Sequence, residues 1–322
     1  MRAALLAVVV SGLLLASPQL PAQTYPSKPV RIVAPFAPGG LVDVLSRALG
    51  EQLARSLGQP FVVDNRPGAG GNVGADLVAR AEPDGYTLLM SSAGILTINQ
   101  FLYERMTFDP ASAFAPVSVV ADMPMLLVVR NDLAARDVME FMALAKKTSG
   151  GLFFGSPGNG TTGHLGMELF MHATALKLQH VPYKSAAEAV HAALSGQTAA
   201  MFENPPTVMS QVKAGSLRAL GVAAKERLSQ LPEVPTISEA GVPGFEASSW
   251  FGLVAPAGTP RQVVERLSAE TAKSLKSPEL QGRFAQSGAR LVGNTPESFA
   301  ALIAQDRARW GAVIKSAGIR LQ

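Results

Sequence analysis

Residues 30–43 read V-R-I-V-A-P-F-A-P-G-G-L-V-D, and residues 152–164 read L-F-F-G-S-P-G-N-G-T-T-G-H. In both stretches an apolar strand runs into a glycine-rich turn that opens directly onto a helix. Glycine lets bare backbone approach a ligand, and the free N–H groups and positive dipole end of the following helix attract negative charge. Two such loops predict two halves of the molecule that bind one anion between them. Neither loop contains an obvious nucleophile or metal cluster, so the pattern indicates capture without chemistry.

Residues 1–22 have the three-part pattern of a secretory signal peptide. A basic start, Met1-Arg2, precedes an uncharged apolar stretch and a segment rich in Pro and small residues. The apolar stretch is too short for a membrane span, and no later segment is long and apolar enough to be one. We expect export to a bacterial periplasm, with cleavage after Ala22 or, alternatively, after Ala16.

The amino-acid composition argues against several classes of function. The chain has 322 residues, 16% of them charged and 48% hydrophobic, with Lys and Arg scattered along it. The length predicts about two domains. No basic stripe interleaved with aromatic residues occurs, so we expect no nucleic-acid partner. The chain has no cysteine, which excludes disulfides and thiolate metal sites.

Strand and helix patterns alternate along the chain. Leucines recur at every fourth residue over 41–57, which predicts a helix, and the strand–helix alternation predicts α/β units with mostly parallel sheets flanked by helices. Thr259-Pro260 and Thr295-Pro296 each predict a helix cap followed by a proline at the first helical position.

The chain is predicted to leave one unit near Met123 and to return to it near Ala247. These two crossovers define the predicted lobes: residues 23–122 and 247–322 form lobe 1, and residues 123–246 form lobe 2.

A series of short motifs, in order along nearly the whole mature chain, carries a family resemblance. They are Y-P-S-K-P-V-R at 25–31, P-F-A-P-G-G at 35–40, N-R-P-G-A-G-G-N at 65–72, P-D-G-Y at 83–86, G-N-G-T at 158–161, H-V-P-Y-K at 180–184, S-S-W-F-G-L at 248–253 and A-P-A-G-T-P at 255–260. Together they resemble the extracytoplasmic solute receptors of the tripartite tricarboxylate transporters, the Bug family.

The resemblance implies a two-lobed periplasmic-binding-protein fold of the Venus flytrap type. It implies a receptor that captures a small organic carboxylate and delivers it to transporter membrane components. We further expect a monomer that needs neither a cofactor nor a metal. In that family the carboxylate is held by backbone N–H groups and waters from two facing loops, which map here to residues 36–40 and 156–162.

The candidate ligand-binding residues lie in these two loops, in the helices that follow them and at the carboxyl ends of strands. They are Phe36, Ala37, Pro38, Gly39, Gly40, Asp43, Ser91, Ser92, Ser156, Gly158, Asn159, Gly160, Thr161, Thr162, His164 and Glu203. Asp43 could instead cap its helix, and His164 could instead pack or cap in the first turn of its own.

Glu203 is predicted to tune which carboxylate is accepted. It follows an apolar strand and is therefore predicted to lie at a strand's carboxyl end, where ligands of α/β proteins bind. Its charge would repel a second anionic group on the ligand. The family strand often reads D-M-M-F-D-N where this chain has A-A-M-F-E-N at 199–204, and Ser185 stands where the family often has glycine. These departures leave the ligand's identity open.

Two other functions remain open. The same fold could present its liganded form to a sensor kinase, which the identity of the neighbouring genes would reveal. A remote alternative is a dinucleotide-dependent enzyme, because Gly158–Gly163 fits G-x-G-x-x-G. The strand that follows lacks the acidic residue that holds the ribose hydroxyls in such sites.

Overall fold

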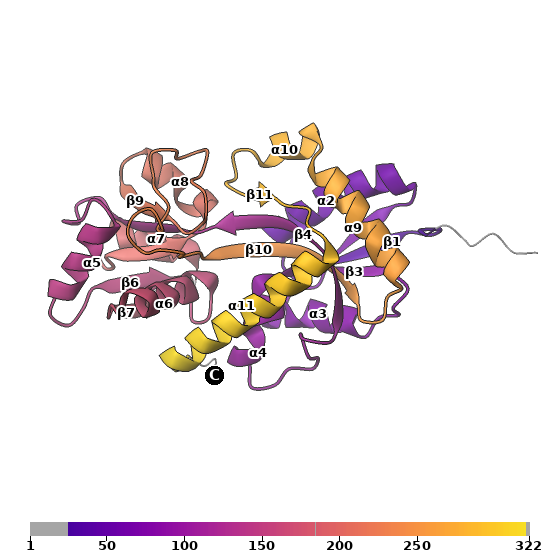
Figure 1. Cartoon of the computed structure of the whole chain (residues 1–322), viewed down its shortest axis with the longest axis horizontal. Helices are drawn as coiled ribbons and strands as arrows, with labels where there is room; N and C mark the ends of the chain where they lie inside the picture. Colours follow the sequence, from indigo (N-terminus) through magenta and orange to yellow (C-terminus); the bar gives the residue numbers. More distant parts are fainter. Residues whose placement is uncertain (1–24, 184, 320–322) are drawn as a thin grey trace, which may run out of the picture.

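The computed structural model describes residues 25–183 and 185–319. The predicted signal peptide therefore lies outside the described residues. The described chain forms two α/β units that follow one another along the long axis of the molecule and are joined by two long strands (Figure 1).

The strands are β1 (Val30–Ala34), β2 (Phe61–Asn65), β3 (Thr87–Ser92), β4 (Phe114–Pro124), β5 (Leu126–Arg130), β6 (Phe153–Ser156), β7 (Gln179–Pro182), β8 (Ala200–Glu203), β9 (Leu217–Val222), β10 (Ser248–Pro256) and β11 (Arg290–Leu291). The α-helices are α2 (Leu41–Leu57), α3 (Asn72–Ala79), α4 (Asn99–Leu102), α5 (Val138–Lys147), α6 (Thr162–Thr174), α7 (Ala186–Leu194), α8 (Pro205–Lys213), α9 (Arg261–Leu275), α10 (Pro278–Phe284) and α11 (Pro296–Ala317). A 3-10 turn, η1 (Ala69–Gly71), and a π-helical turn, η2 (Gly94–Ile98), precede α3 and α4.

The first unit contains a six-stranded sheet in the order β11-β4-β10-β3-β1-β2, and the second a five-stranded sheet in the order β7-β6-β8-β5-β9. The two-lobed α/β prediction is confirmed, but the expectation of mostly parallel sheets is wrong. β1 is parallel to β2 and β3, and β6 is parallel to β7 and β8, whereas every pairing of β4, β5, β10 or β11 is antiparallel. β4 leaves the first unit and β10 returns to it, so adjacent crossover strands must run in opposite directions.

These two crossover strands pair along their whole length, from Ser248 opposite Pro124 to Pro256 opposite Phe114. The predicted crossovers fall at the end of β4 and just before β10. The division of the chain at residues 122/123 and 246/247 stays a prediction.

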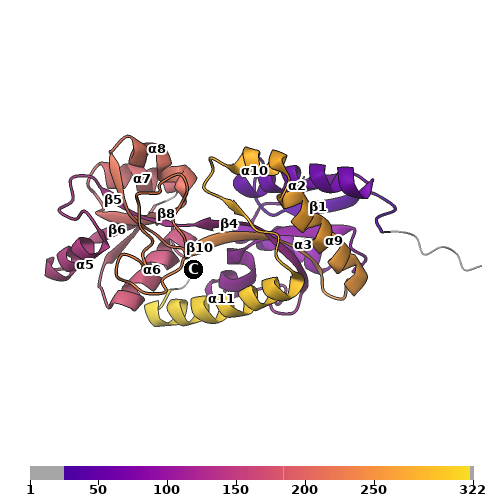
Figure 2. The ribbon, with the colours of Figure 1, turned by 45° about the horizontal axis from the view of Figure 1, so that its top comes forward.

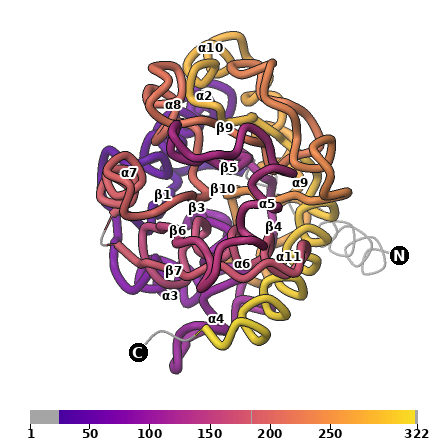
Figure 3. Tube along the Cα trace, turned by 90° about the vertical axis from the view of Figure 1, so that its left-hand side faces the viewer, coloured from indigo at the N-terminus to yellow at the C-terminus, as the bar shows by residue number. Residues whose placement is uncertain are grey.

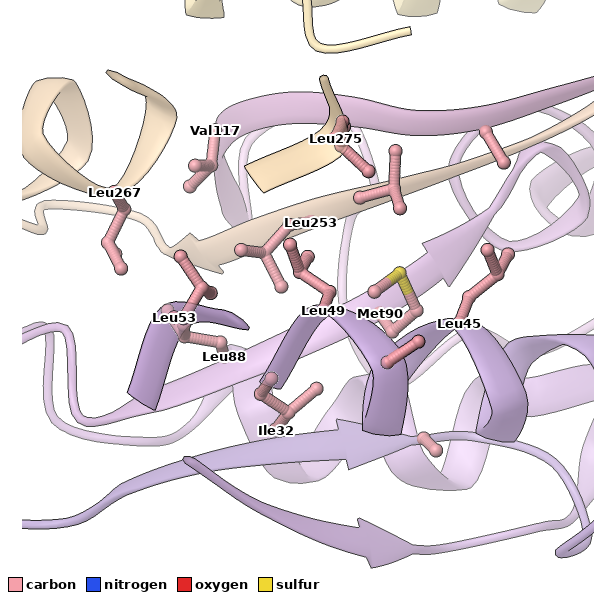
Figure 4. Close-up of a cluster of buried hydrophobic side chains, with 14 of the residues drawn as sticks. Ile32, Leu45, Leu49, Leu53, Leu88, Met90, Val117, Leu253, Leu267 and Leu275 are labelled. Carbon is pink, nitrogen blue, oxygen red and sulfur yellow. The ribbon is translucent and has the colours of Figure 1, made fainter. Parts of the chain in front are cut away.

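Helix α2 shows how the sequence pattern builds the core of the first unit. Leu45, Leu49 and Leu53 lie on one face of α2 and belong to the same buried cluster as Ile32 and Leu88 of the sheet (Figure 4). Burying each such side chain contributes about 1.5–3 kcal/mol. α3 and α11 cover the opposite face of this sheet, so the unit has helices on both faces.

Helix α11 connects the two units. Its first turns pack on the first sheet through Phe299, and its last turns pack on the second unit, where Trp310 and Ile314 contact Leu165 of α6. The helix runs along both units in the rotated view (Figure 2), and the view along the long axis places it beside α4 and α6 (Figure 3). Among the described residues, no helix has the length and hydrophobicity needed to cross a bilayer.

Candidate functional site

A cavity of about 350 Å³ lies between the two units, in the size range of small-molecule sites. The first unit lines it with Phe36, Gly70, Ser92, Ala93, Gly94, Ile98, Asn99, Leu102, Tyr103, Ser249, Trp250 and Phe251, and the second with Asn159, Gly160, Thr161, Thr162 and Asn204. As far as the described residues define it, this lining contains no Lys, Arg, Asp or Glu. An anion placed here would meet backbone, hydroxyl and amide donors beside apolar walls.

The first loop is held by Asp43. Gly39 has φ +85°, and its N–H donates to Asp43 Oδ2 at 3.0 Å. Arg47 binds the same carboxylate with its Nε at 3.1 Å from Oδ2, and Asn65 Nδ2 donates both to Asp43 Oδ1 at 3.0 Å and to the Phe36 carbonyl at 3.1 Å. The Arg47 hydrogen bond lowers the pKa of Asp43 to about 2, so this buried carboxylate is charged and fully partnered.

The second loop uses the same spacing with a different acceptor. Gly160 has φ +74°, and its N–H donates to His164 Nδ1, four residues later, at 3.0 Å. Thr161 caps α6, because its Oγ1 accepts from the N–H of His164 and donates to the Gly158 carbonyl. In both loops, therefore, the N–H of the left-handed glycine is used within the protein and is not the group offered to a ligand.

The amino termini of α2 and α6 differ in their capping. Within the described part of the chain, no side chain caps the 17-residue helix α2 at Gly40, whereas Thr161 caps α6. The N–H groups of the first turn have no intrahelical acceptor and sit at the positive end of the helix dipole. Of residues 36–42, however, only Phe36 lines the cavity.

The two units contact each other beside the cavity. Thr162 Oγ1 and Ser249 Oγ lie 3.1 Å apart across the interface. A Cβ atom built on Gly160 would lie 2.4 Å from Leu102 Cδ1, so the second loop passes close to α4 and a larger residue would have to displace the Leu102 side chain. Trp250 forms a fixed wall, because its Nε1 donates to the buried Asp306 at 2.7 Å.

Glu203 lies behind the cavity and does not line it. It is 4% exposed at the end of β8, and its Oε1 accepts from the N–H of Asn204, which does line the cavity. Burial raises the pKa of Glu203 to about 7. Any influence of Glu203 on a ligand would act through Asn204 or through its charge, and its predicted role in selectivity stays a prediction.

The structure brings together only part of the predicted site. Phe36, Ser92, Asn159, Gly160, Thr161 and Thr162 line the cavity. Ala37, Pro38, Gly39 and Gly40 are exposed next to Phe36, and Gly158 is half-buried next to Asn159. Asp43, Ser91, Ser156, His164 and Glu203 are buried behind the lining.

Sequence reasoning missed the wall opposite the second loop. Ile98, Asn99, Leu102 and Tyr103 come from the π-helical turn η2 and from α4. π-Helical turns often occur at functional sites, but the sequence of this one carries no recognisable signal. Gly70 lies in the N-R-P-G-A-G-G-N motif and Asn204 directly follows Glu203, so the motif and the neighbouring residue could have indicated these two.

The buried Ser156 forms a Ser–His contact that could suggest hydrolysis. Its Oγ lies 2.6 Å from His180 Nε2, within the range of a nucleophile–base pair. Ser156 is fully buried and does not line the cavity, so a substrate in the cavity would not reach its hydroxyl. In the described part of the chain, no group of three or more His, Asp or Glu side chains could hold a metal ion.

Comparison with known proteins identifies similar chains. Residues 45–319 match the family described as "Tripartite tricarboxylate transporter family receptor". Protein BugT of Bordetella pertussis is 37% identical over 302 residues, which cover 94% of this chain and 93% of BugT. A UPF0065 protein from the tcbD-tcbE intergenic region of Pseudomonas sp. strain P51 is 41% identical over 291 residues, covering 90% of this chain and 86% of the relative.

Two solved structures are also similar to this chain. The structure of Rpa4515 from R. palustris with adipate has a TM-score of 0.77 and 37% identity, covering 92% of this chain and 100% of the other. MatC from Rhodopseudomonas palustris with bound malate has a TM-score of 0.73 and 31% identity, covering 90% of this chain and 100% of the other. Both similarities span the two units described above.

Proposed function

This chain belongs to the tripartite tricarboxylate transporter receptor family, and from that premise we propose that it captures a small carboxylate in the cavity between its two units and delivers it to a membrane permease of the same transporter type. Adipate and malate, found in the two similar structures, are both small carboxylates. Export to the periplasm, through the signal peptide predicted over residues 1–22, is part of the proposal.

One observation carries the proposal: both glycine-rich loops predicted from the sequence contribute to the same cavity, from opposite units. Phe36 belongs to the loop before the uncapped α2, and residues 159–162 belong to the loop before α6. A carboxylate suits this site because amide donors in such loops favour negative charge without an Arg side chain. The apolar walls, Leu102 and Trp250 among them, would contact the rest of the ligand.

The proposal includes binding without turnover. The mature protein is expected to be stabilised against heat by at least one carboxylate in a panel that includes adipate, malate, aromatic acids and amino acids. A ligand present at 100 times its Kd should stabilise the folded state by about 2.7 kcal/mol. Thermal shift identifies the ligand, and calorimetry measures its affinity. Absence of binding across the panel, or conversion of a carboxylate by the pure protein, would overturn the proposal.

Ligand binding is expected to close the two units by bending at the two crossover strands. Two paired connections between units favour hinge bending over twisting. Small-angle scattering should give a smaller radius of gyration at ligand saturation than without ligand. An unchanged profile at proven saturation contradicts closure.

A further inference from the structure

Two stacked imidazoles lie directly behind the second loop. His164 of α6 and His180 of β7 have ring centroids 3.7 Å apart and an angle of 9° between the ring planes. Phe154 of β6 extends the stack, with its centroid 4.8 Å from that of His180. His164 is 4% exposed, and neither histidine lines the cavity. The pair is therefore placed to act on the loop and not on a ligand.

Each imidazole is connected to a different amide of the loop. His164 Nδ1 accepts from the N–H of Gly160 at 3.0 Å. His180 Nε2 lies 2.6 Å from Ser156 Oγ, and that same oxygen accepts from the N–H of Gly158 at 3.1 Å. The directions of two peptide groups, at Gly158 and Gly160, are thus set by the stacked pair.

The hydrogen bond from Gly160 requires a neutral His164 ring, and burial favours the neutral form of His180. His164 can accept at Nδ1 only when that nitrogen carries no proton, which leaves Nε2–H facing Glu168 Oε1 at 3.4 Å. Burial lowers the pKa of His180 to about 3. The first loop uses the charged Asp43 for the same purpose and neutralises it with Arg47. The second loop obtains its acceptor without introducing a charge beside the cavity.

We propose that His164 and His180 are positioning residues for ligand binding, which hold residues 156–160 in the conformation that the second loop presents to the cavity. This inference rests on the proposed function for its ligand. Neither histidine lines the cavity, so their effect on the loop can be measured without a ligand.

The test compares three substitutions on α6 and one on β7. His164→Asn keeps an acceptor four residues after Gly160, as Asp43 is four residues after Gly39, whereas His164→Leu removes the acceptor. His172→Leu, at an exposed position of the same helix, is the matched control. His180→Phe keeps an aromatic ring in the stack but removes the contact with Ser156.

Two readouts are measured on the mature protein: affinity for adipate, and hydrogen exchange of the Gly158 and Gly160 amides in ¹⁵N-glycine-labelled protein. His164→Leu should weaken adipate binding about tenfold and speed Gly160 exchange about tenfold, the size expected for one lost hydrogen bond. His164→Asn and His172→Leu should stay within about threefold of wild type in both readouts. His180→Phe should affect Gly158 exchange most.

Equal behaviour of His164→Asn and His164→Leu overturns the proposal, and so does wild-type exchange in both His164→Leu and His180→Phe. If the wild-type protein binds neither adipate nor any other carboxylate tested, the proposed function fails. The exchange measurements then still decide whether the two histidines hold the loop.

Discussion

The Glu203→Gln protein is expected to be more stable than wild type at pH 8 and to differ little from it at pH 4. Burial raises the pKa of Glu203 to about 7 in the folded protein, against an ordinary value of 4.5. The folded state therefore binds more protons than the unfolded state between these two values, so stability decreases as pH rises through this range. The difference corresponds to about 3 kcal/mol at pH 8. Gln keeps the size of the side chain and has no charge to bury.

Urea unfolding of the two proteins at pH 4, 6 and 8 measures this effect. Glu226→Gln, at an exposed position of the same unit, is the matched control and should show no pH-dependent difference from wild type. A constant difference between Glu203→Gln and wild type across the three pH values would contradict the assignment of a buried, charged Glu203 at pH 8. The same result would remove the electrostatic basis for a role of Glu203 in selectivity.

Local sequence signals predicted the helices and strands well where the pattern is periodic. The four-residue leucine spacing predicted α2, and Thr295 caps α11 as predicted. Thr259 does not cap α9, because its Oγ1 donates to the Pro256 carbonyl and Pro260 takes the cap position. Both threonines precede a proline, so the sequence could not distinguish a cap from a turn.

The candidate site was only partly predictable, for a physical reason. The two glycine-rich loops have local signals, because a strand, a turn and a helix start occur within a few residues. The opposite wall depends on how α4 packs against the second unit and α11, through Leu102, Leu165 and Trp310. These residues are 63 or more positions apart, and no local pattern connects them. His180 was missed as the partner of His164 for the same reason, because their strand and helix meet only in the folded protein.

The second large effect is expected from Gly160→Ala, which should weaken ligand binding about 100-fold or more. A Cβ atom at this position would lie 2.4 Å from Leu102 Cδ1, well inside van der Waals contact. Leu102 is 4% exposed and packs against Ile98, Leu165 and Trp310, so its side chain could move only toward the cavity that it lines, into the space of a ligand. The added methyl group should therefore keep the two units from closing on a ligand.

Loss of closure must be separated from the backbone cost of replacing a left-handed glycine. Gly215 provides the matched control, because it lies in the same unit with φ +70°, against +74° for Gly160. A Cβ atom built on Gly215 has no atom of the described residues within 4 Å. Gly215→Ala and Gly160→Ala should both lose about 1–2 kcal/mol of stability from the left-handed backbone. Gly215→Ala should nevertheless bind its carboxylate ligand as wild type does, measured by calorimetry.

A double-mutant cycle then assigns the lost affinity to the contact between the units. Leu102→Ala removes the atoms that a methyl group at position 160 would meet, so Gly160→Ala should cost about threefold or less in affinity in the Leu102→Ala background, against about 100-fold in wild type. The coupling between the two positions would be about 2 kcal/mol. Because Leu102 also lines the cavity, only the difference between backgrounds counts, and not the affinity of Leu102→Ala itself. If Gly160→Ala costs the same in both backgrounds, the contact with Leu102 does not limit closure, and the loop glycine acts through its backbone conformation alone.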